Sequence, residues 1–203
     1  INNSRIVRKR VELMPIKIKK LTPSLATIYT NFLGSLDFDH EPHWASCFCR
    51  FYHTDCSYDD WKSKTAQENR EDALNAIITG RMCGYLAFDG ERCIGWCNAN
   101  QAKEYIRLKA EMAPVIGNKR VGCIICFVIH PDYRNQGLAR VFIQHAIDDF
   151  KSQNYDGVLA LPFETVDQPQ KRYRGTVNMY LEHGFEVIQE HGNLKVMYLE
   201  LSK

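Results

Sequence analysis

The fold is decided by residues 121–139, VGCIICFVIHPDYRNQGLA. The first nine are almost all apolar, which indicates a strand buried on both faces. Residues 130–133 (HPDY) interrupt this run, and an amphipathic helical pattern begins at Leu138. A tight turn before a helix points unpaired backbone N–H groups into one concavity, where the helix dipole also favours negative charge. The stretch therefore predicts a strand, a turn and a helix whose junction binds an anion such as a pyrophosphate.

The residues of the turn suit this role. Gly137 has no Cβ, so a phosphate can approach the backbone closely there. The guanidinium of Arg134 adds a fixed positive fork, and Ala139 keeps the first turn of the helix small. We therefore expect anion contacts from Arg134, Asn135, Gln136, Gly137, Leu138 and Ala139.

Two segments carry a resemblance to a known family. The turn, RNQGLA, follows an apolar strand and resembles the signature R/Q-x-x-G-x-G/A of the GNAT superfamily of acetyl-CoA-dependent N-acetyltransferases. Residues 173–185, YRGTVNMYLEHGF, resemble the closing helix of that family, which ends in Y-x-x-x-G-F. The two segments occur in the order that the family has. One position departs from the pattern, because Tyr173 stands where many members have an asparagine that contacts the cofactor.

The resemblance extends over residues 14–203 and implies one domain with a mixed α/β fold of the GNAT type. Such a domain has a central, mostly antiparallel sheet of six to seven strands, helices on both faces, and a splay between the fourth and fifth strands. We expect residues 1–13 to be an N-terminal extension or leader, and the domain to begin at Met14. Small members of the superfamily are monomers or homodimers, and we expect either state here.

Local patterns agree with this order of elements. Residues 16–19 alternate apolar and charged side chains, as a half-buried strand does, and Thr22-Pro23 predicts the start of a helix that ends at Gly34. Thr65 and Glu68 form a capping box for a second helix that ends at Gly80. The expected core faces of these two helices carry Leu25, Ile28, Tyr29, Phe32 and Leu33 in the first, and Ala73, Ala76 and Ile77 in the second.

The remaining elements follow from similar signals. Asp89-Gly90 predicts a tight hairpin turn between strands at 83–88 and 91–97. A crossover helix is expected at 138–151, followed by strands at 157–161, 185–189 and 194–201. Residues 37–60 show no sustained period and predict no regular element.

The resemblance also implies the chemistry, which is direct transfer of an acetyl group from acetyl-CoA to a primary amine in a ternary complex. It places the pantetheine along the fourth strand, so that the backbone of Phe127, Val128 and Ile129 contacts the cofactor. Tyr180 matches the tyrosine that protonates the leaving thiolate, and a phenol with an ordinary pKa of about 10 suits that task. Taken alone, Tyr180 is better explained as a half-buried aromatic residue of an amphipathic helix, and the acid role is favoured only together with Gly184-Phe185 and the anion-binding turn.

The general base is not identified by the sequence. Histone-acetylating members have a glutamate four residues before the position of Phe127, and this chain has Cys123 there, which suits packing better than proton abstraction. The side chains that could take the place of this glutamate as the base are Glu104, Glu164, Asp167 and His130, and a water chain is a further possibility.

The segment 44–58, WASCFCRFYHTDCSY, allows three interpretations. Cys47, Cys49 and Cys56, with His53 or His43, have the ligand types of a zinc site, but Cys-x-Cys is shorter than the usual spacing of about 2 to 4 residues, so we expect no metal. The simplest alternative is a loop that packs over the domain. The third is an acceptor pocket with an aromatic wall, built from Trp44, Phe48, Phe51, Tyr52 and Tyr58. With Trp96 and Asn98 of the third strand, the expected substrate contacts are Trp44, Tyr52, Trp96 and Asn98.

Composition excludes several other functions. The 203-residue chain has a formal net charge of +2 and no strong basic run, which argues against nucleic-acid binding. It has neither a signal-peptide pattern nor an apolar stretch of the roughly 20 residues that span a bilayer, so we expect no membrane association, a cytoplasmic location and eight free thiols. The motifs GxxxxGK[ST], GxGxxG and HExxH are absent.

We therefore predict an acyltransferase that uses acetyl-CoA as co-substrate and acetylates an amine of a small molecule or a peptide. The alternative is a domain of the same fold that binds acyl-CoA without catalysis, as a sensor does.

Overall fold

A computed structural model describes residues 15–36, 47–165 and 169–201. The expected leader, His43, Trp44 and Asp167 lie outside these ranges. A seven-stranded sheet forms the centre of the molecule, with the strand order β1-β2-β3-β4-β5-β7-β6. Only the pair β4–β5 is parallel, and the other five pairs are antiparallel. The strands are β1 (Lys17–Lys20), β2 (Gly84–Asp89), β3 (Arg92–Gln101), β4 (Val121–Ile129), β5 (Gly157–Ala160), β6 (Glu186–His191) and β7 (Leu194–Glu200).

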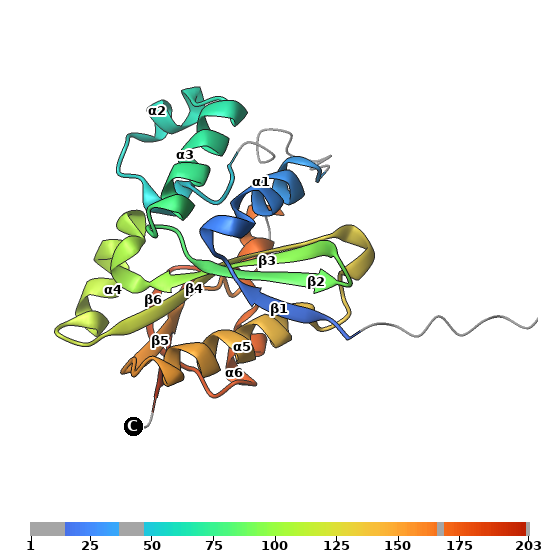
Figure 1. The fold of residues 1–203 in the computed structure, drawn as a ribbon. Helices are drawn as coiled ribbons and strands as arrows, with labels where there is room; N and C mark the ends of the chain where they lie inside the picture. Colours follow the sequence, from blue (N-terminus) through green and yellow to red (C-terminus); the bar gives the residue numbers. More distant parts are fainter. Residues whose placement is uncertain (1–14, 37–46, 166–168, 202–203) are drawn as a thin grey trace, which may run out of the picture.

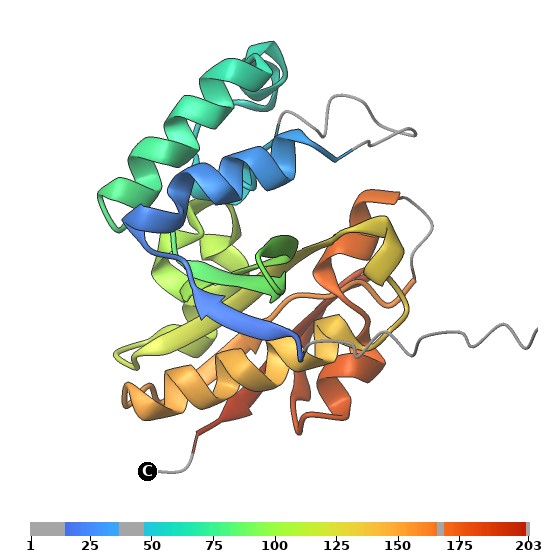
Figure 2. The same cartoon turned by 45° about the vertical axis from the view of Figure 1, so that its right-hand side comes forward.

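Helices cover both faces of the sheet, as expected for the GNAT fold. In Figures 1 and 2, α1 and α3 lie above the sheet, and α5 and α6 lie below it. The helices are α1 (Ala26–Gly34), α2 (Tyr58–Ser63), α3 (Ala66–Ile78), α4 (Lys109–Ile116), α5 (Leu138–Ser152) and α6 (Val177–Leu181). Single 3-10 turns connect many of them: η1 (Pro23–Leu25), η3 (Phe51–His53), η4 (Ala102–Glu104), η5 (Ile106–Leu108), η6 (Pro131–Tyr133) and η7 (Pro169–Arg174).

The core has one layer on each face of the sheet. On the lower face, Phe142, Ala146 and Phe150 of α5 pack with Tyr180 against the strands. On the upper face, α1 and α3 pack over Trp96, and the segment from η4 to α4 packs over the first half of β4. Burying one such aromatic side chain contributes about 2 to 3 kcal/mol, so both layers add substantially to the free energy of unfolding.

Two irregularities of β4 position the candidate site. First, β4 pairs with β5 only from Val121 to Ile124, so its second half has no neighbour in β5. This divergence is the splay that the resemblance implies. Second, the register with β3 passes from Asn98–Cys126 to Ala99–Ile124, which leaves Ile125 as the extra residue of a β-bulge. The bulge shifts the alternation of side chains, so Cys126 packs on the upper face together with Ile125.

Most local predictions are confirmed. The Thr65–Glu68 capping box forms, the hairpin turns at Asp89 and Gly90, and β4 has the predicted bounds. Ile28 was wrongly assigned to the core and is 39% exposed, because the buried stripe of α1 follows Ala26, Tyr29, Thr30 and Leu33. Thr22 does not cap the helix, and its hydroxyl contacts Ser24 instead. Helices α2 and α4 were not predicted at all.

Candidate active site

The turn between β4 and α5 has the backbone conformation of an anion site. Asn135 and Gly137 both adopt left-handed conformations, with φ of 59° and 84°. Asparagine tolerates this region and glycine adopts it without strain. A Cβ at Gly137 would meet no atom within 4 Å, so the turn requires glycine for its φ rather than for space. The helix α5 then begins at Leu138.

The N–H groups of this turn are available to a ligand. Within the part of the chain that the structure describes, the backbone amides of residues 135–139 donate no hydrogen bond, whereas the amides of Arg140 and Val141 both donate to the carbonyl of Gly137. Residues 134–137 are exposed. Successive free amides at a helix N-terminus form a concavity that favours anions. The six residues expected to bind an anion therefore lie together in one turn.

Side chains hold the turn in place. The Tyr133 hydroxyl donates a hydrogen bond of 2.6 Å to Asp89 of the β2–β3 hairpin, and the side-chain Nε2 of Gln136 donates to the backbone carbonyl of Asp132 at 2.7 Å. The Nε of Arg134 donates to the carbonyl of Ile129, the last residue of β4, at 3.1 Å. This bond holds the guanidinium beside that end of the strand.

The splayed half of β4 offers backbone groups on its open side. The amide of His130 donates to the carbonyl of Ile94 in β3 at 2.9 Å. Backbone groups alternate in direction along an antiparallel pair, so Val128 also faces β3, whereas Phe127 and Ile129 face away from it. Arg134 takes the carbonyl of Ile129. Among the described residues, the backbone N–H and C=O of Phe127 therefore remain available to a ligand. Val128 was also expected to contact the cofactor, but its backbone N–H and C=O face β3.

Tyr180 lies beside Phe127, beneath the splay. A Cβ at Gly175 would come within 3.2 Å of both rings, which places the two aromatics on either side of that glycine. The Tyr180 side chain is fully buried, and its hydroxyl donates to the carbonyl of Arg174 at 3.0 Å. Burial raises the pKa of this phenol well above its ordinary value, so it stays protonated at neutral pH. Such a group can act as an acid but not as a base.

Arg174 connects Tyr180 to the upper face of the sheet, and the sequence analysis did not identify it. The residue is 7% exposed, and its guanidinium donates to the Tyr52 hydroxyl from Nε and Nη2, at 3.0 and 2.8 Å. Its Nη1 donates to the carbonyl of Leu161, just past the end of β5, at 3.1 Å. Burial raises the pKa of Tyr52, so this phenol accepts the two hydrogen bonds in its neutral form. No local sequence pattern predicts a contact across such distances along the chain.

Two of the expected substrate contacts are core residues instead. Trp96 is fully buried, packs edge-on against Tyr29 at 4.7 Å and donates its indole N–H to the Cys49 sulfur at 3.3 Å. Asn98 is also fully buried, and its amide is bonded to Tyr105 and His53. The loop at 47–53 covers both residues, so a substrate cannot reach them. Tyr52 remains the expected contact that lies near the splay.

His53 belongs to a buried chain of neutral hydrogen bonds. Its Nδ1 donates to the carbonyl of Glu104 at 3.1 Å, and its Nε2 accepts from the Asn98 amide at 3.3 Å. The carbonyl oxygen of Asn98 accepts from the Tyr105 hydroxyl at 2.9 Å. Burial and the nearby Arg50 lower the pKa of His53 to about 4, so the imidazole is neutral at pH 7. The chain fixes the loop that contains His53 on the upper face of β3.

The cysteines of this loop do not gather around a metal. Among the residues that the structure describes, no group of three or more His, Cys, Asp or Glu side chains is placed to hold an ion. The sulfur of Cys49 contacts that of Cys126 at 3.8 Å, whereas Cys56 contacts Thr54 and Arg107. Burial raises the pKa of Cys47 to about 12. The zinc alternative is therefore left without its ligand set.

The candidate bases lie away from the splay. Cys123 is fully buried in the core, and burial raises the pKa of its thiol. Glu164 forms an ion pair with Lys195 at 3.1 Å, and His130 contacts Arg92 and Asp132 at the outer end of the turn. Glu104 lines a cavity elsewhere in the molecule. The contacts of the three described candidates, Glu104, Glu164 and His130, therefore place none of them beside Phe127.

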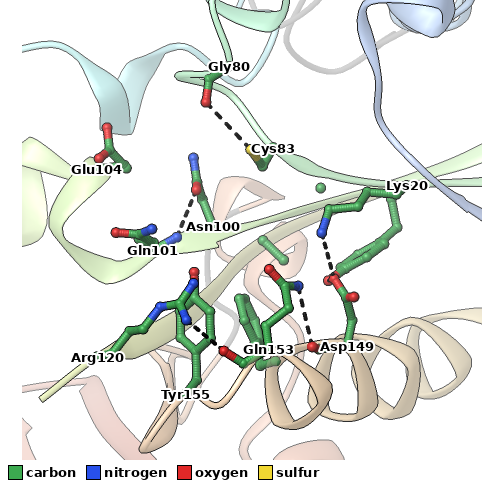
Figure 3. A pocket seen from close by; sticks show the side chains of 14 residues that line it. Lys20, Gly80, Cys83, Asn100, Gln101, Glu104, Arg120, Asp149, Gln153 and Tyr155 are labelled. Atoms are coloured by element: carbon green, nitrogen blue, oxygen red, sulfur yellow. Dashed lines mark hydrogen bonds and ion pairs between the residues drawn. The ribbon is translucent and has the colours of Figure 1, made fainter.

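That cavity, shown in Figure 3, has a volume of about 190 Å³. It lies among the start of β2, the end of β3, the start of β4 and the C-terminal end of α5. At a rise of 1.5 Å per residue, its lining residue Asp149 is about 17 Å along α5 from the turn. Its charged groups are largely paired, since Asp149 accepts hydrogen bonds from Lys20 at 3.1 Å and from Tyr85 at 2.7 Å. The cavity is therefore separate from the candidate active site.

Comparison with known proteins agrees with the geometry. The model of the acetyltransferase (GNAT) family matches residues 43–185. The chain belongs to this family of acetyltransferases. No curated protein matches the chain. Within the described ranges, no helix is long and apolar enough to cross a membrane.

Solved structures support the fold. A GNAT-family acetyltransferase from Streptococcus pneumoniae is 18% identical, with a TM-score of 0.54, over 93% of this chain and 100% of that one. The PaiA N-acetyltransferase from Thermoplasma acidophilum in complex with coenzyme A is 13% identical, with a TM-score of 0.53, over 92% and 99%. A chimera of the spermidine N-acetyltransferase SpeG from Vibrio cholerae and hSSAT is 16% identical, with a TM-score of 0.53, over 93% and 96%. At these identities the likeness concerns the fold alone.

The buried chain around His53 predicts a pH-dependent loss of stability. The imidazole has a pKa of about 4 when folded and about 6.5 when unfolded, so the unfolded state binds the proton more readily. The stabilisation that depends on the neutral imidazole is therefore complete above pH 6.5, and it is lost as the pH falls toward 4. Between pH 7.5 and 4.5 we expect His53 to account for a loss of about 2 to 3 kcal/mol in the free energy of unfolding.

Urea unfolding at pH 7.5 and pH 4.5, for the native chain and for His53→Gln, measures this loss in the free energy of unfolding. The glutamine variant retains a polar amide but cannot titrate, so its own loss should be smaller by that amount. His191→Gln, on the exposed strand β6, is the control and should change nothing. Equal losses for the native chain and His53→Gln would contradict the buried neutral imidazole.

Proposed function

We propose that this protein is an N-acetyltransferase that transfers the acetyl group of acetyl-CoA directly to a primary amine. One observation carries the proposal, namely that the free amides of residues 135–139 lie at the end of a strand whose second half has no neighbour in β5. An anion site alone would fit many ligands. An anion site that continues into an open strand edge fits a long ligand with a pyrophosphate at one end, as coenzyme A has.

The chain offers a consistent set of contacts to such a ligand. The amides of residues 135–139 bind the pyrophosphate, and Arg134 adds its positive charge. Arg140 is less available for this role, because its Nε and Nη2 both donate hydrogen bonds to the carboxylate of Glu182. The pantetheine then extends along β4 toward Phe127, whose backbone N–H is free to donate to the thioester oxygen.

The transfer itself requires one bond to form and one to break. The neutral amine attacks the thioester carbon, the C–N bond forms, and negative charge develops on the oxygen beside the Phe127 amide. The C–S bond then breaks, and the Tyr180 phenol supplies a proton to the departing thiolate. To do so, its hydroxyl must exchange the Arg174 carbonyl for the sulfur as its hydrogen-bond acceptor. The proton of the attacking amine passes to water, since none of the three described base candidates has a contact at this point.

The acceptor is an amine of a small molecule or a peptide. Tyr52 and Arg174 lie at the splay on the acceptor side, and the cationic guanidinium is placed over the Tyr52 ring at 4.7 Å. We expect the enzyme to work in a ternary complex, without an acetylated intermediate, in the cytoplasm.

A second function is favoured by two observations. The Tyr180 hydroxyl is already bonded to a backbone carbonyl, and the three described base candidates, Glu104, Glu164 and His130, have their contacts elsewhere. A domain with these properties could bind acyl-CoA and report its concentration without catalysis.

Purified protein separates the two functions. We expect calorimetric titration to show acetyl-CoA binding, and a panel of amines to include at least one that releases free coenzyme A faster than the uncatalysed reaction. The panel should contain polyamines, amino acids and peptide N-termini. Binding of acetyl-CoA with no thiol release from any amine would favour the sensor over the enzyme.

Gly137→Glu tests the anion site. A carboxylate at this position repels a pyrophosphate, and the residue must also adopt a left-handed φ, so we expect affinity for coenzyme A to fall at least about tenfold, or about 1.4 kcal/mol. Gly192→Glu is a matched control, because Gly192 also has a positive φ of 59° and open space around it, but lies in the β6–β7 hairpin. Unchanged affinity in Gly137→Glu would refute the assignment of the turn.

Tyr180→Phe tests the proposed acid. The substitution retains the ring and removes the proton donor, so we expect kcat to fall about 100-fold with little change in KM. Tyr85→Phe is the control, because its buried hydroxyl is also hydrogen-bonded, to Asp149 at the distant cavity, and its loss should leave kcat unchanged. A native kcat in Tyr180→Phe would show that water protonates the thiolate.

A further inference from the structure

Two cysteine sulfurs from distant parts of the chain are in contact beside the candidate active site. Cys49 lies in the loop before η3, and Cys126 lies on β4, 77 residues further along. Their sulfur atoms are 3.8 Å apart. A disulfide requires about 2.0 Å between the two sulfurs, so Cys49 and Cys126 must move toward each other for the bond to form.

The loop holds Cys49 at this place by specific contacts. Phe48 and Cys49 are both left-handed, with φ of 41° and 51°, which side chains other than glycine and asparagine rarely adopt. The Tyr29 hydroxyl donates to the carbonyl of Phe48 at 2.8 Å, and the Trp96 indole donates to the Cys49 sulfur at 3.3 Å. The fold therefore maintains an uncommon backbone conformation that directs this sulfur toward β4.

The β-bulge of β4 brings the second sulfur to the same face. Because Ile125 is the extra residue, Cys126 follows it on the upper face of the sheet rather than the lower one. Cys126 is half-buried, whereas Cys49 is 6% exposed. The pair thus consists of one thiol that a reagent can reach and one that is covered.

We propose that Cys49 and Cys126 form a reversible disulfide, and that the site takes a low-molecular-weight disulfide such as oxidised glutathione as its oxidant. The Cys126 thiolate attacks one sulfur of the reagent, whose S–S bond breaks and releases one thiol. The hydrogen bond with Cys126 and burial raise the pKa of Cys49, so its thiol loses its proton only as its sulfur attacks the Cys126 sulfur of the mixed disulfide and releases the second thiol. Two protein thiols are oxidised, one reagent disulfide is reduced, and the two protons pass to the two released thiols.

The position of the pair gives the disulfide a consequence for function, which rests on the proposed acetyl transfer. Cys126 directly precedes Phe127, whose free backbone groups lie at the open edge of β4. Drawing Cys126 toward the 47–49 loop moves the peptide that joins it to Phe127. We therefore expect the oxidised form to transfer acetyl groups more slowly than the reduced form.

Other half-buried cysteines provide internal comparisons. The Cys93 thiol donates to the carbonyl of Gly95 at 3.9 Å, and the Cys83 thiol donates to the carbonyl of Gly80 at 3.7 Å. Reagent can reach these two as well, but a glutathione adduct is the end point we expect for them.

Peptide mapping without reductant tests the pair independently of any activity. After incubation with oxidised glutathione, we expect a cross-linked peptide that contains Cys49 and Cys126 and that disappears on treatment with dithiothreitol. Cys49→Ser should stop the reaction at a glutathione adduct on Cys126, and Cys126→Ser should give neither product at this site. Cys93→Ser is the control and should leave the cross-link intact. Absence of the cross-link, or a cross-link between other cysteines, would overturn the proposal.

The effect on function is measured separately. Oxidised protein should release coenzyme A at least about tenfold more slowly than the same sample after dithiothreitol, and Cys126→Ser should show no difference between the two treatments. A cross-link that forms without any change in rate would refute the regulatory role and leave the disulfide itself established. If the protein transfers no acetyl group in either state, the proposed function fails, and the mapping result still decides the disulfide.

Discussion

The early end of the β4–β5 pairing is the constraint on which the rest of the site depends. The two strands pair over only four residues each, and this short ladder is tightly packed, because a Cβ at Gly122 would come within 2.7 Å of the Phe150 ring and one at Gly157 within 2.2 Å of Tyr198. Beyond the ladder, β4 continues to Ile129 paired with β3 but not with β5, while Arg174 donates a hydrogen bond to the carbonyl of Leu161. The free backbone N–H and C=O of Phe127 are the direct result, because a β5 as long as β4 would have formed hydrogen bonds with both groups.

The β-bulge determines which side chains of β4 lie on the upper face of the sheet and which lie on the lower face. Phe127 packs below the sheet with Phe142 and Tyr180, whereas Cys126 packs above it near the loop of Cys49. The anion-binding turn begins at Arg134, eight residues after Cys126. One strand therefore connects three features, which are the open backbone, the buried phenol and the thiol pair, and any movement of this strand acts on all of them.

Features that obey local rules could be predicted from the sequence, and features that depend on distant packing could not. The apolar run of β4, the turn with Gly137 and the Thr65 capping box are each determined by a few neighbouring residues. Trp96 and Asn98 lie on the expected strand, but they are buried because the irregular loop at 47–53 covers them. Arg174 reaches Tyr52 from 122 residues away, so no spacing along the chain could have indicated that contact.

Burial leaves the interior of the site without an ionised base. It raises the pKa of Tyr180 and of Cys123, which keeps a phenol and a thiol protonated, and it lowers the pKa of His53 to about 4, which keeps an imidazole neutral. The charged group that persists there is Arg174, which is stabilised by the Tyr52 hydroxyl, by a backbone carbonyl and by stacking on two aromatic rings. In the proposed transfer, we expect this positive charge beside the splay to disfavour a protonated amine, so that an acceptor loses its proton before it reaches the thioester. We expect the same charge to stabilise the leaving thiolate, and so to promote cleavage of the C–S bond more strongly than attack by the amine.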